Sequence, residues 1–310
     1  MECVLGFASL GSGGLVKLRS IQVLRAVAAI AVVLFHFTKG GFAIGPAGVD
    51  LFFVISGFIM ATVSPGRTAR QFLADRAWRI YPLYFVCLAM FVPLVALDRS
   101  QCQDIASLTL WPVWGEYCNS YLIPAWTLSL ELFFYGLVAL TITRSNLLFA
   151  IMLSLVATGV VFSSPLTQFV GHPMMLEFLM GFAIARLPLN SRAGWSMLVL
   201  SLVPAVAFYP VDFYSWQRVI VCGVPAAALA YVTLCHEGLF ARKAFALPVL
   251  LGDASYSIYL VHFSVLALNF SNPLIGIYVA VFGGYFVYLV VEKPLLGWRR
   301  KRQRLDPAVA

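Results

Sequence analysis

The sequence predicts an all-α protein, a polytopic membrane bundle of about ten transmembrane helices with both termini on the cytoplasmic side. Its composition gives the first reason: of 310 residues, 61% are hydrophobic and 11% are charged, against about 25% charged in soluble domains. The mean hydropathy of +0.90 means that apolar side chains outnumber those that the core of a water-exposed globule can hold. The composition therefore excludes a soluble domain as the main body of the chain.

Long apolar segments give the second reason. A transmembrane helix needs about 20 mostly apolar residues. Segments of this kind, mostly separated by Pro, Gly or charged residues, are expected near 21–38, 47–63, 80–97, 122–142, 146–163, 171–187, 193–209, 217–235, 249–269 and 273–292. The segments at 171–187 and 193–209 are short, so the expected number is ten, give or take one.

The placement of basic residues supports this count, because cytoplasmic loops of membrane proteins carry the excess of Lys and Arg. With the N-terminus inside and alternate loops outward, 17 of the 21 basic residues fall on the inner side. These are Lys17, Arg19, Arg67, Arg70, Arg76, Arg79, Arg144, Arg186, Arg192, Arg242, Lys243, Lys293, Arg299, Arg300, Lys301, Arg302 and Arg304. Lys39, Arg99 and Arg218 fall outside, and Arg25 lies within the first segment. The high pI thus reflects topology, and no nucleic-acid partner is expected.

The chain divides into three parts on this reading. Residues 1–19 form a cytoplasmic or interfacial lead, 20–296 a transmembrane domain, and 297–310 a basic cytoplasmic tail. The first 16 residues have no basic segment ahead of an apolar stretch, so no cleaved signal peptide is expected.

Two of the six cysteines share the long outer loop at about 98–123. A disulfide between Cys102 and Cys118 is plausible if the loop faces an oxidising compartment, and two unpaired thiols are an equal alternative. Cys87, Cys222 and Cys235 lie in or at the ends of segments, and Cys3 lies in the lead. No Cys or His spacing indicates a metal site.

Ionisable groups inside membrane segments usually mark function or a structural pair. Arg25 and His36 are 11 residues apart on the first segment, so they share one helix face and lie about 16 Å apart along its axis. Arg25 is then near the inner end and His36 near the outer end. The plainer alternatives are a snorkelling arginine and a hydrogen-bonded core histidine.

Asp50 begins the second segment, at the same outer level as His36. A carboxylate there could orient the imidazole of a general base, or it could cap its own helix. Ser56 and Gly57 further along are read mainly as packing positions that allow close helix approach.

Arg76 and Arg79 lie three residues apart on the inner loop before the third segment and face the same way at helical spacing. Two guanidinium groups suit phosphate recognition, although on spacing alone membrane anchoring is favoured. On the fourth segment Glu131 lies about 10 Å below the outer surface and shares a face with Tyr135. It is a candidate for proton transfer or a structural hydrogen-bonding partner, as is Glu177 on the sixth segment.

These segments together resemble the acyltransferase-3 family of integral membrane acyltransferases, and within it the stand-alone bacterial exopolysaccharide O-acetyltransferases. The resemblance rests on six elements in order along nearly the whole chain. They are Arg25 to His36, Gly48-Val49-Asp50 through Phe58, Arg76-x-x-Arg79, Trp126-Thr127-Leu128-Ser129-x-Glu131, Ser255-Tyr256-Ser257-Ile258-Tyr259-x-x-His262, and Glu292-Lys293-Pro294.

The resemblance implies transfer of an acyl group, usually acetyl from acetyl-CoA as co-substrate with no bound cofactor, to a sugar hydroxyl of a glycan. The expected acceptor is a lipid-linked oligosaccharide or a growing polysaccharide, and the expected location is the bacterial inner membrane. His36, Asp50 and Glu131 become the catalytic candidates. Arg25, Arg76, Arg79, Ser255 and Tyr256 become the substrate-binding candidates, with the arginine pair on the coenzyme A phosphates.

Two other classes of function remain open from the residues alone. Intramembrane His, Asp and Glu also fit a proton-coupled exporter of glycan-related substrates. Against a transporter, no inverted repeat or pair of broken helices is evident, and the arginine pair is left unexplained. A structural membrane subunit is the third reading, and it would not need His36.

Overall fold

The computed structural model describes residues 17–95, 100–142, 144–209 and 216–305. The N-terminal lead up to residue 16, Cys3, Arg99 and the last five residues lie outside the described residues. The described parts are helical throughout, without a strand, apart from one isolated bridge between Val113 and Tyr117. The all-α prediction is therefore confirmed for this part of the chain.

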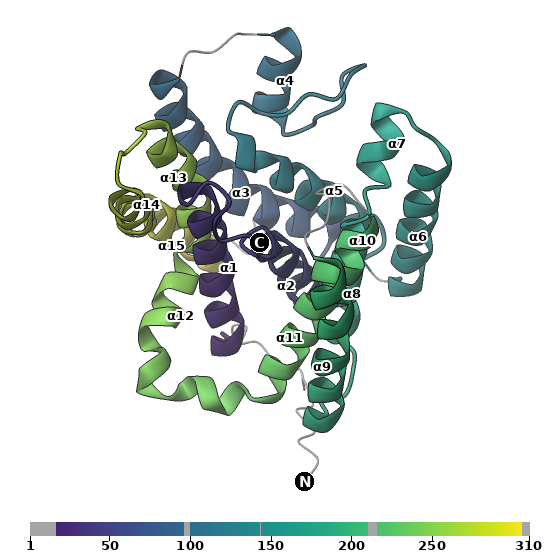
Figure 1. The fold of residues 1–310 in the computed structure, drawn as a ribbon. Coiled ribbons are helices and arrows are strands. Elements are labelled where there is room, and N and C mark those ends of the chain that lie inside the picture. The colour runs from purple at the N-terminus through teal and green to yellow at the C-terminus, as the bar shows by residue number, and fades with distance from the viewer. Residues whose placement is uncertain (1–16, 96–99, 143, 210–215, 306–310) are drawn as a thin grey trace.

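The first half of the chain contains the central helices and the loop with Cys102 and Cys118. Figure 1 places α1 and α2 at the centre, with α4 above them. The helices are α1 (Arg19–Phe37), α2 (Ala47–Val63), α3 (Ala69–Phe91), α4 (Gln101–Thr109), α5 (Trp126–Leu140) and α6 (Ser145–Val161). Short 3₁₀ turns precede α5 and follow α3.

The second half surrounds this centre, with α14 and α9 on different sides of the bundle (Figure 1). The helices are α7 (Pro165–Val170), α8 (Met175–Ile184), α9 (Ser191–Phe208), α10 (Trp216–Arg218), α11 (Val224–Cys235), α12 (Ala246–Asp253), α13 (Ser255–Ala267), α14 (Pro273–Val287) and α15 (Lys293–Leu305). Two π-helical turns interrupt this half, η3 (Val219–Gly223) and η6 (Tyr288–Glu292).

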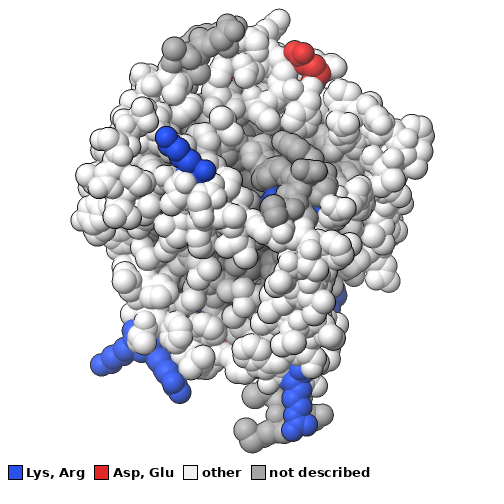
Figure 2. Space-filling model, in the orientation of Figure 1, with Lys and Arg blue, Asp and Glu red and all other residues white. Residues whose placement is uncertain are grey.

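Six helices among the described residues are long and apolar enough to cross a membrane, and a seventh span results if α12 and α13 count as one. Two shorter apolar helices, α2 and α6, add to these, and α8 has only 10 residues. The chain is a multi-pass membrane protein, while the number of ten spans and the cytoplasmic termini stay predictions. Figure 2 shows a face with few charged side chains, with basic ones projecting from its lower end near α12 and α9.

Three boundaries differ from the prediction. The third helix was expected at 80–97 but begins at Ala69, so Arg76 and Arg79 lie inside α3 and not on a loop. The ninth segment, expected as one helix over 249–269, bends by 60° between α12 and α13. The last segment, expected to end at 292, continues through η6 into α15, where Pro294 is tolerated near a helix start.

Close helix packing holds α2 in the centre. A side-chain carbon at Gly57 would lie 2.0 Å from the carbonyl oxygen of Phe178, and one at Gly181 would lie 1.8 Å from that of Val54. Only glycine permits this approach of α2 and α8, as expected for small residues at membrane-helix interfaces. The packing role expected for Gly57 is confirmed.

Polar contacts at the ends of α3 and α15 fasten the tail helix to the bundle. Asp75 on α3 accepts hydrogen bonds from Arg67, from Arg299 at 3.4 Å and from the Gln303 side chain at 2.5 Å. Trp78 and Trp298 stack with their ring centroids 5.2 Å apart. The tail helix α15 therefore packs on the helix that carries the arginine pair.

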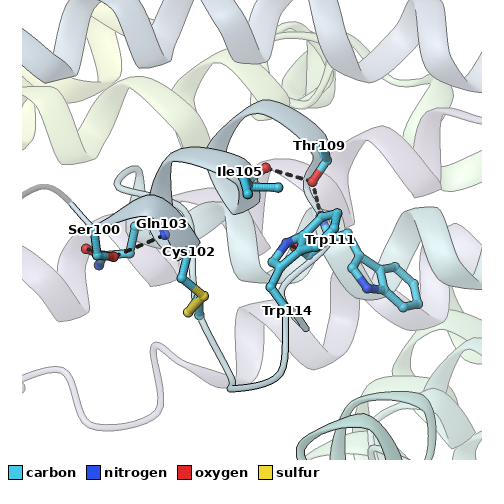
Figure 3. The surroundings of a disulfide bond; sticks show 8 residues. Ser100, Cys102, Gln103, Ile105, Thr109, Trp111 and Trp114 are labelled. Atoms are coloured by element: carbon cyan, nitrogen blue, oxygen red, sulfur yellow. Dashed lines mark hydrogen bonds between the residues drawn. A yellow bond between two sulfur atoms is a disulfide. The ribbon is translucent and has the colours of Figure 1, made fainter.

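The loop that the sequence predicts to lie outside is cross-linked. Cys102 at the start of α4 forms a disulfide with Cys118, with the Cα atoms 6.0 Å apart, and Figure 3 shows it beside the capping contact between Ser100 and Gln103. Of the two alternatives left open by the sequence, the structure has the disulfide.

Candidate active site

A cavity of about 180 Å³ lies between α1, α2, α3, α5 and α13. Its polar wall combines cations with a carboxylate and hydroxyl groups; the residues are Arg25, Ser56, Arg76, Arg79, Thr127, Glu131, Tyr135, Tyr256 and Tyr259. Apolar side chains such as Phe52, Phe53 and Ile59 complete the wall. Five of the eight predicted site residues therefore meet here: Arg25, Arg76, Arg79, Glu131 and Tyr256.

Three arginines give the cavity its basic side. Arg79 forms an ion pair with Glu292 and lies over the ring of Tyr256, 5.4 Å from its centroid. Arg25 donates from Nε to the hydroxyl of Ser255 at 3.1 Å, which explains how Ser255 belongs to the site without lining the cavity. The Nε of Arg76 is buried without a hydrogen-bond partner in the described part of the chain, so this group is available to an anion.

Glu292 was not among the predicted site residues. It ends the π-turn η6, is 2% exposed, and accepts from both Arg79 and the hydroxyl of Ser257. π-turns frequently occur at functional sites. The sequence signal that could have identified Glu292 was its place in the Glu292-Lys293-Pro294 element, at the end of an apolar segment.

The acidic side of the cavity is formed by Glu131. Its Oε1 accepts from the hydroxyl of Ser56 at 2.8 Å and from that of Tyr135. Glu131 and Tyr135 share a helix face, as the i, i+4 spacing predicts. Ser56 is therefore a polar contact of the cavity as well as a packing position.

His36 lies outside the set of residues that line the cavity. Its Nδ1 contacts the carbonyl oxygen of Val32 at 2.9 Å, and its ring faces that of His262 on α13 with centroids 5.0 Å apart. Arg25 and His36 both contact α13, so the predicted common face of α1 is confirmed. Tyr259, on the cavity wall, has its ring 5.7 Å from that of His262, so the two histidines lie near this wall.

In the described part of the chain, Asp50 is paired with Arg218 and not, as expected, with His36. Both carboxylate oxygens of Asp50 accept from Arg218, at 3.1 and 2.6 Å. The nearby Glu177 is fully buried and interacts electrostatically with this pair. The structure therefore pairs Asp50 with a cation far away in the chain instead of with His36, and its catalytic role stays a prediction.

Fold and site define a membrane-embedded enzyme with an internal, mostly basic cavity. The chain matches the model of the acyltransferase-3 family, described as an acyltransferase domain, over residues 18–291. It belongs to this family of membrane acyltransferases, which transfer groups other than aminoacyl groups. This membership decides against the transporter and structural-subunit readings.

Curated relatives agree with the family match. The chain is 32% identical to the exopolysaccharide production protein ExoZ of Rhizobium meliloti, over 88% of this chain and 96% of that protein. It is 28% identical to the putative membrane-bound transacylase BcsY of Komagataeibacter xylinus, over 79% of this chain and 72% of that protein. The peptidoglycan O-acetyltransferase OatA of Listeria monocytogenes is 26% identical, over 81% of this chain and 49% of its own length.

Proposed function

We propose that this protein transfers an acyl group, in the first instance acetyl, from acyl-CoA to a sugar hydroxyl of a bacterial exopolysaccharide or other surface glycan. The cavity carries the proposal, since three arginines converge in it from α1 and α3. Guanidinium groups match the phosphates of coenzyme A in charge and geometry. The relatives named for exopolysaccharide production and O-acetylation support a glycan acceptor.

The donor binds with its phosphates at Arg76 and Arg79 and its pantetheine arm extending along the cavity toward Phe52 and Tyr259. Arg25 lies on the same face of α1 as His36 and steadies the arm or the developing oxyanion. In this arrangement the thioester reaches the region of His36 from the inner side, while the sugar approaches from the outer side. The topology assumed here is the one predicted from the charges, in the bacterial inner membrane.

His36 takes the proton of the acceptor hydroxyl, or it first carries the acyl group itself. In the general-base route the hydroxyl oxygen attacks the thioester carbon, the carbon–sulfur bond breaks, and an ester forms. The proton held by His36 passes to the departing coenzyme A thiolate, which completes the balance. Glu131 serves as a hydrogen-bonding or proton-relay partner inside the cavity.

The test is acyl transfer by the purified protein in lipid vesicles. Acetyl-CoA labelled in the acetyl group is supplied with membranes or glycan extracts of the native host, and labelled ester in the glycan is measured. The expected result is base-labile label in the glycan that depends on His36. Labelled acetyl-CoA that is neither bound, hydrolysed nor used would overturn the proposal.

A further inference from the structure

Two histidines from distant parts of the chain meet inside the bundle, His36 on α1 and His262 on α13, with ring centroids 5.0 Å apart and ring planes at 49°. We propose that His262 is a positioning residue for His36, accepting a hydrogen bond from its imidazolium after His36 has taken the proton of the acceptor hydroxyl. This inference rests on the proposed function, because it concerns the same proton.

The ring nitrogens of both histidines can be assigned from their partners. Nδ1 of His36 lies 2.9 Å from the carbonyl oxygen of Val32, and Nδ1 of His262 lies 2.5 Å from that of Tyr259. A carbonyl oxygen only accepts, so each Nδ1 carries a hydrogen, and in a neutral ring Nε2 then carries a lone pair. Both rings therefore hold the same tautomer, with Nε2 left as the basic nitrogen.

His262 has an unmet acceptor. Its side chain is fully buried, and its Nε2 has no hydrogen-bond partner among the described residues. A buried acceptor without a donor is costly. A donor appears once His36 is protonated, since an imidazolium has a hydrogen on both nitrogens.

His262 is a polar side chain beside His36, within surroundings that are otherwise aromatic in their ring contacts among the described residues. Phe263 packs against both rings, with centroids 5.3 Å from His36 and 5.2 Å from His262. Asp50, the carboxylate expected from the sequence to orient His36, has both oxygens bonded to Arg218. Once His36 is protonated, the two rings carry three N–H hydrogens. The two carbonyl oxygens and the Nε2 lone pair of His262 accept them.

The test compares two substitutions of nearly the same length at this position. His262→Gln keeps an oxygen that can accept from His36, whereas His262→Met does not. In the glycan acylation assay, normalised to the protein in the membrane, His262→Met should lower kcat about tenfold or more, because part of the general-base contribution of His36 is lost. His262→Gln should lower kcat less, and the KM for acyl-CoA should not change in either variant.

His236→Met is the matched control, because Nδ1 of His236 makes the same contact to a carbonyl, that of Val232 at 2.9 Å. It should keep the wild-type rate. The pairing would be overturned by a wild-type kcat in His262→Met, by equal losses of kcat in His262→Met and His262→Gln, or by a change in KM alone. Failure of both variants to accumulate would assign His262 to folding and overturn it too. An inactive wild-type protein would refute the proposed function, whereas an active wild type beside an equally active His262→Met refutes the pairing alone.

Discussion

Asp50 and Arg218 form a buried ion pair across 168 residues of chain, with the guanidinium holding both carboxylate oxygens and also the carbonyl oxygen of Pro46. Their side chains are 0% and 4% exposed. Arg218 directly precedes the π-turn η3, so the pair fixes the start of α2 against an irregular part of the second half. We therefore predict that this ion pair acts mainly on stability.

Asp50→Ala should therefore act through stability. It leaves a buried guanidinium without its counter-charge, which costs about 3–5 kcal/mol in buried pairs. The double variant Asp50→Leu, Arg218→Met should recover most of this, since an apolar replacement of a whole buried pair is often neutral or better. Thermal unfolding of the detergent-solubilised protein measures both. A stable but inactive Asp50→Ala would instead return Asp50 to the catalytic machinery.

Loss of Arg76 should weaken acyl-CoA binding. Arg76→Ala removes a guanidinium of the cavity wall that forms no ion pair within the described part of the chain, whereas Arg79→Ala also unpairs Glu292. Arg76→Lys should recover only part of the affinity, because an ammonium lacks the planar fork. The measurement is coenzyme A affinity by calorimetry.

Arg70→Ala is the matched control for this helix, since Arg70 is exposed near the start of α3. It should bind coenzyme A as the wild type does. Unchanged affinity in the double variant Arg76→Ala, Arg79→Ala would assign both residues to membrane anchoring.

His36→Gln should accumulate in the membrane and lose nearly all transfer. General-base catalysis contributes about 10²–10⁴-fold, and an amide cannot take up and release a proton. Glycan acylation is measured beside the amount of protein in the membrane. Wild-type acylation by His36→Gln would make the imidazole structural and the mechanism wrong.

Oxidised protein should have two fewer free thiols before reduction than after, because Cys102 and Cys118 are joined. Cys102→Ser should lower stability by about 3 kcal/mol in the chain-entropy model for a loop of this length. Thiol titration in denaturant and thermal unfolding check the two statements. Equal thiol counts with and without reductant would remove the cross-link and leave the site unchanged.

The topology gives a separate prediction. The positive-inside rule places the segment from Arg67 to Arg79 on the cytoplasmic side and the loop with Cys102 and Cys118 on the other side. Reporter fusions after each segment should give opposite signals. The same signal from both would contradict the predicted topology and, with it, the sides from which donor and acceptor are expected to approach.

The helical fold was predictable because each segment is apolar for long enough to indicate a helix by itself. The predicted helix boundaries were wrong where a charged residue inside the bundle is neutralised by a residue from a distant part of the chain. The third helix was expected to begin after Arg79, since charged residues end an apolar segment, but Glu292 neutralises Arg79 from the other end of the chain.

Part of the site was predictable because charged residues within or beside apolar segments stand out in the sequence. Arg25, Arg76, Arg79 and Glu131 were singled out as charges within or beside apolar segments, and the structure brings them to one cavity. The partner of Asp50 was chosen by nearness in sequence, which favoured His36 over Arg218. His262 was visible as an intramembrane histidine, but only the packing of α1 on α13 brings it to His36.

The contacts of Asp75 have a practical consequence for anyone who handles this protein. The tail helix is bonded to Asp75, one residue before Arg76 on α3, so the tail braces the wall that holds the arginines. A purification tag or truncation that pulls α15 away is therefore expected to change the proposed donor binding without touching any residue of the cavity. Affinity tags therefore belong at the N-terminus.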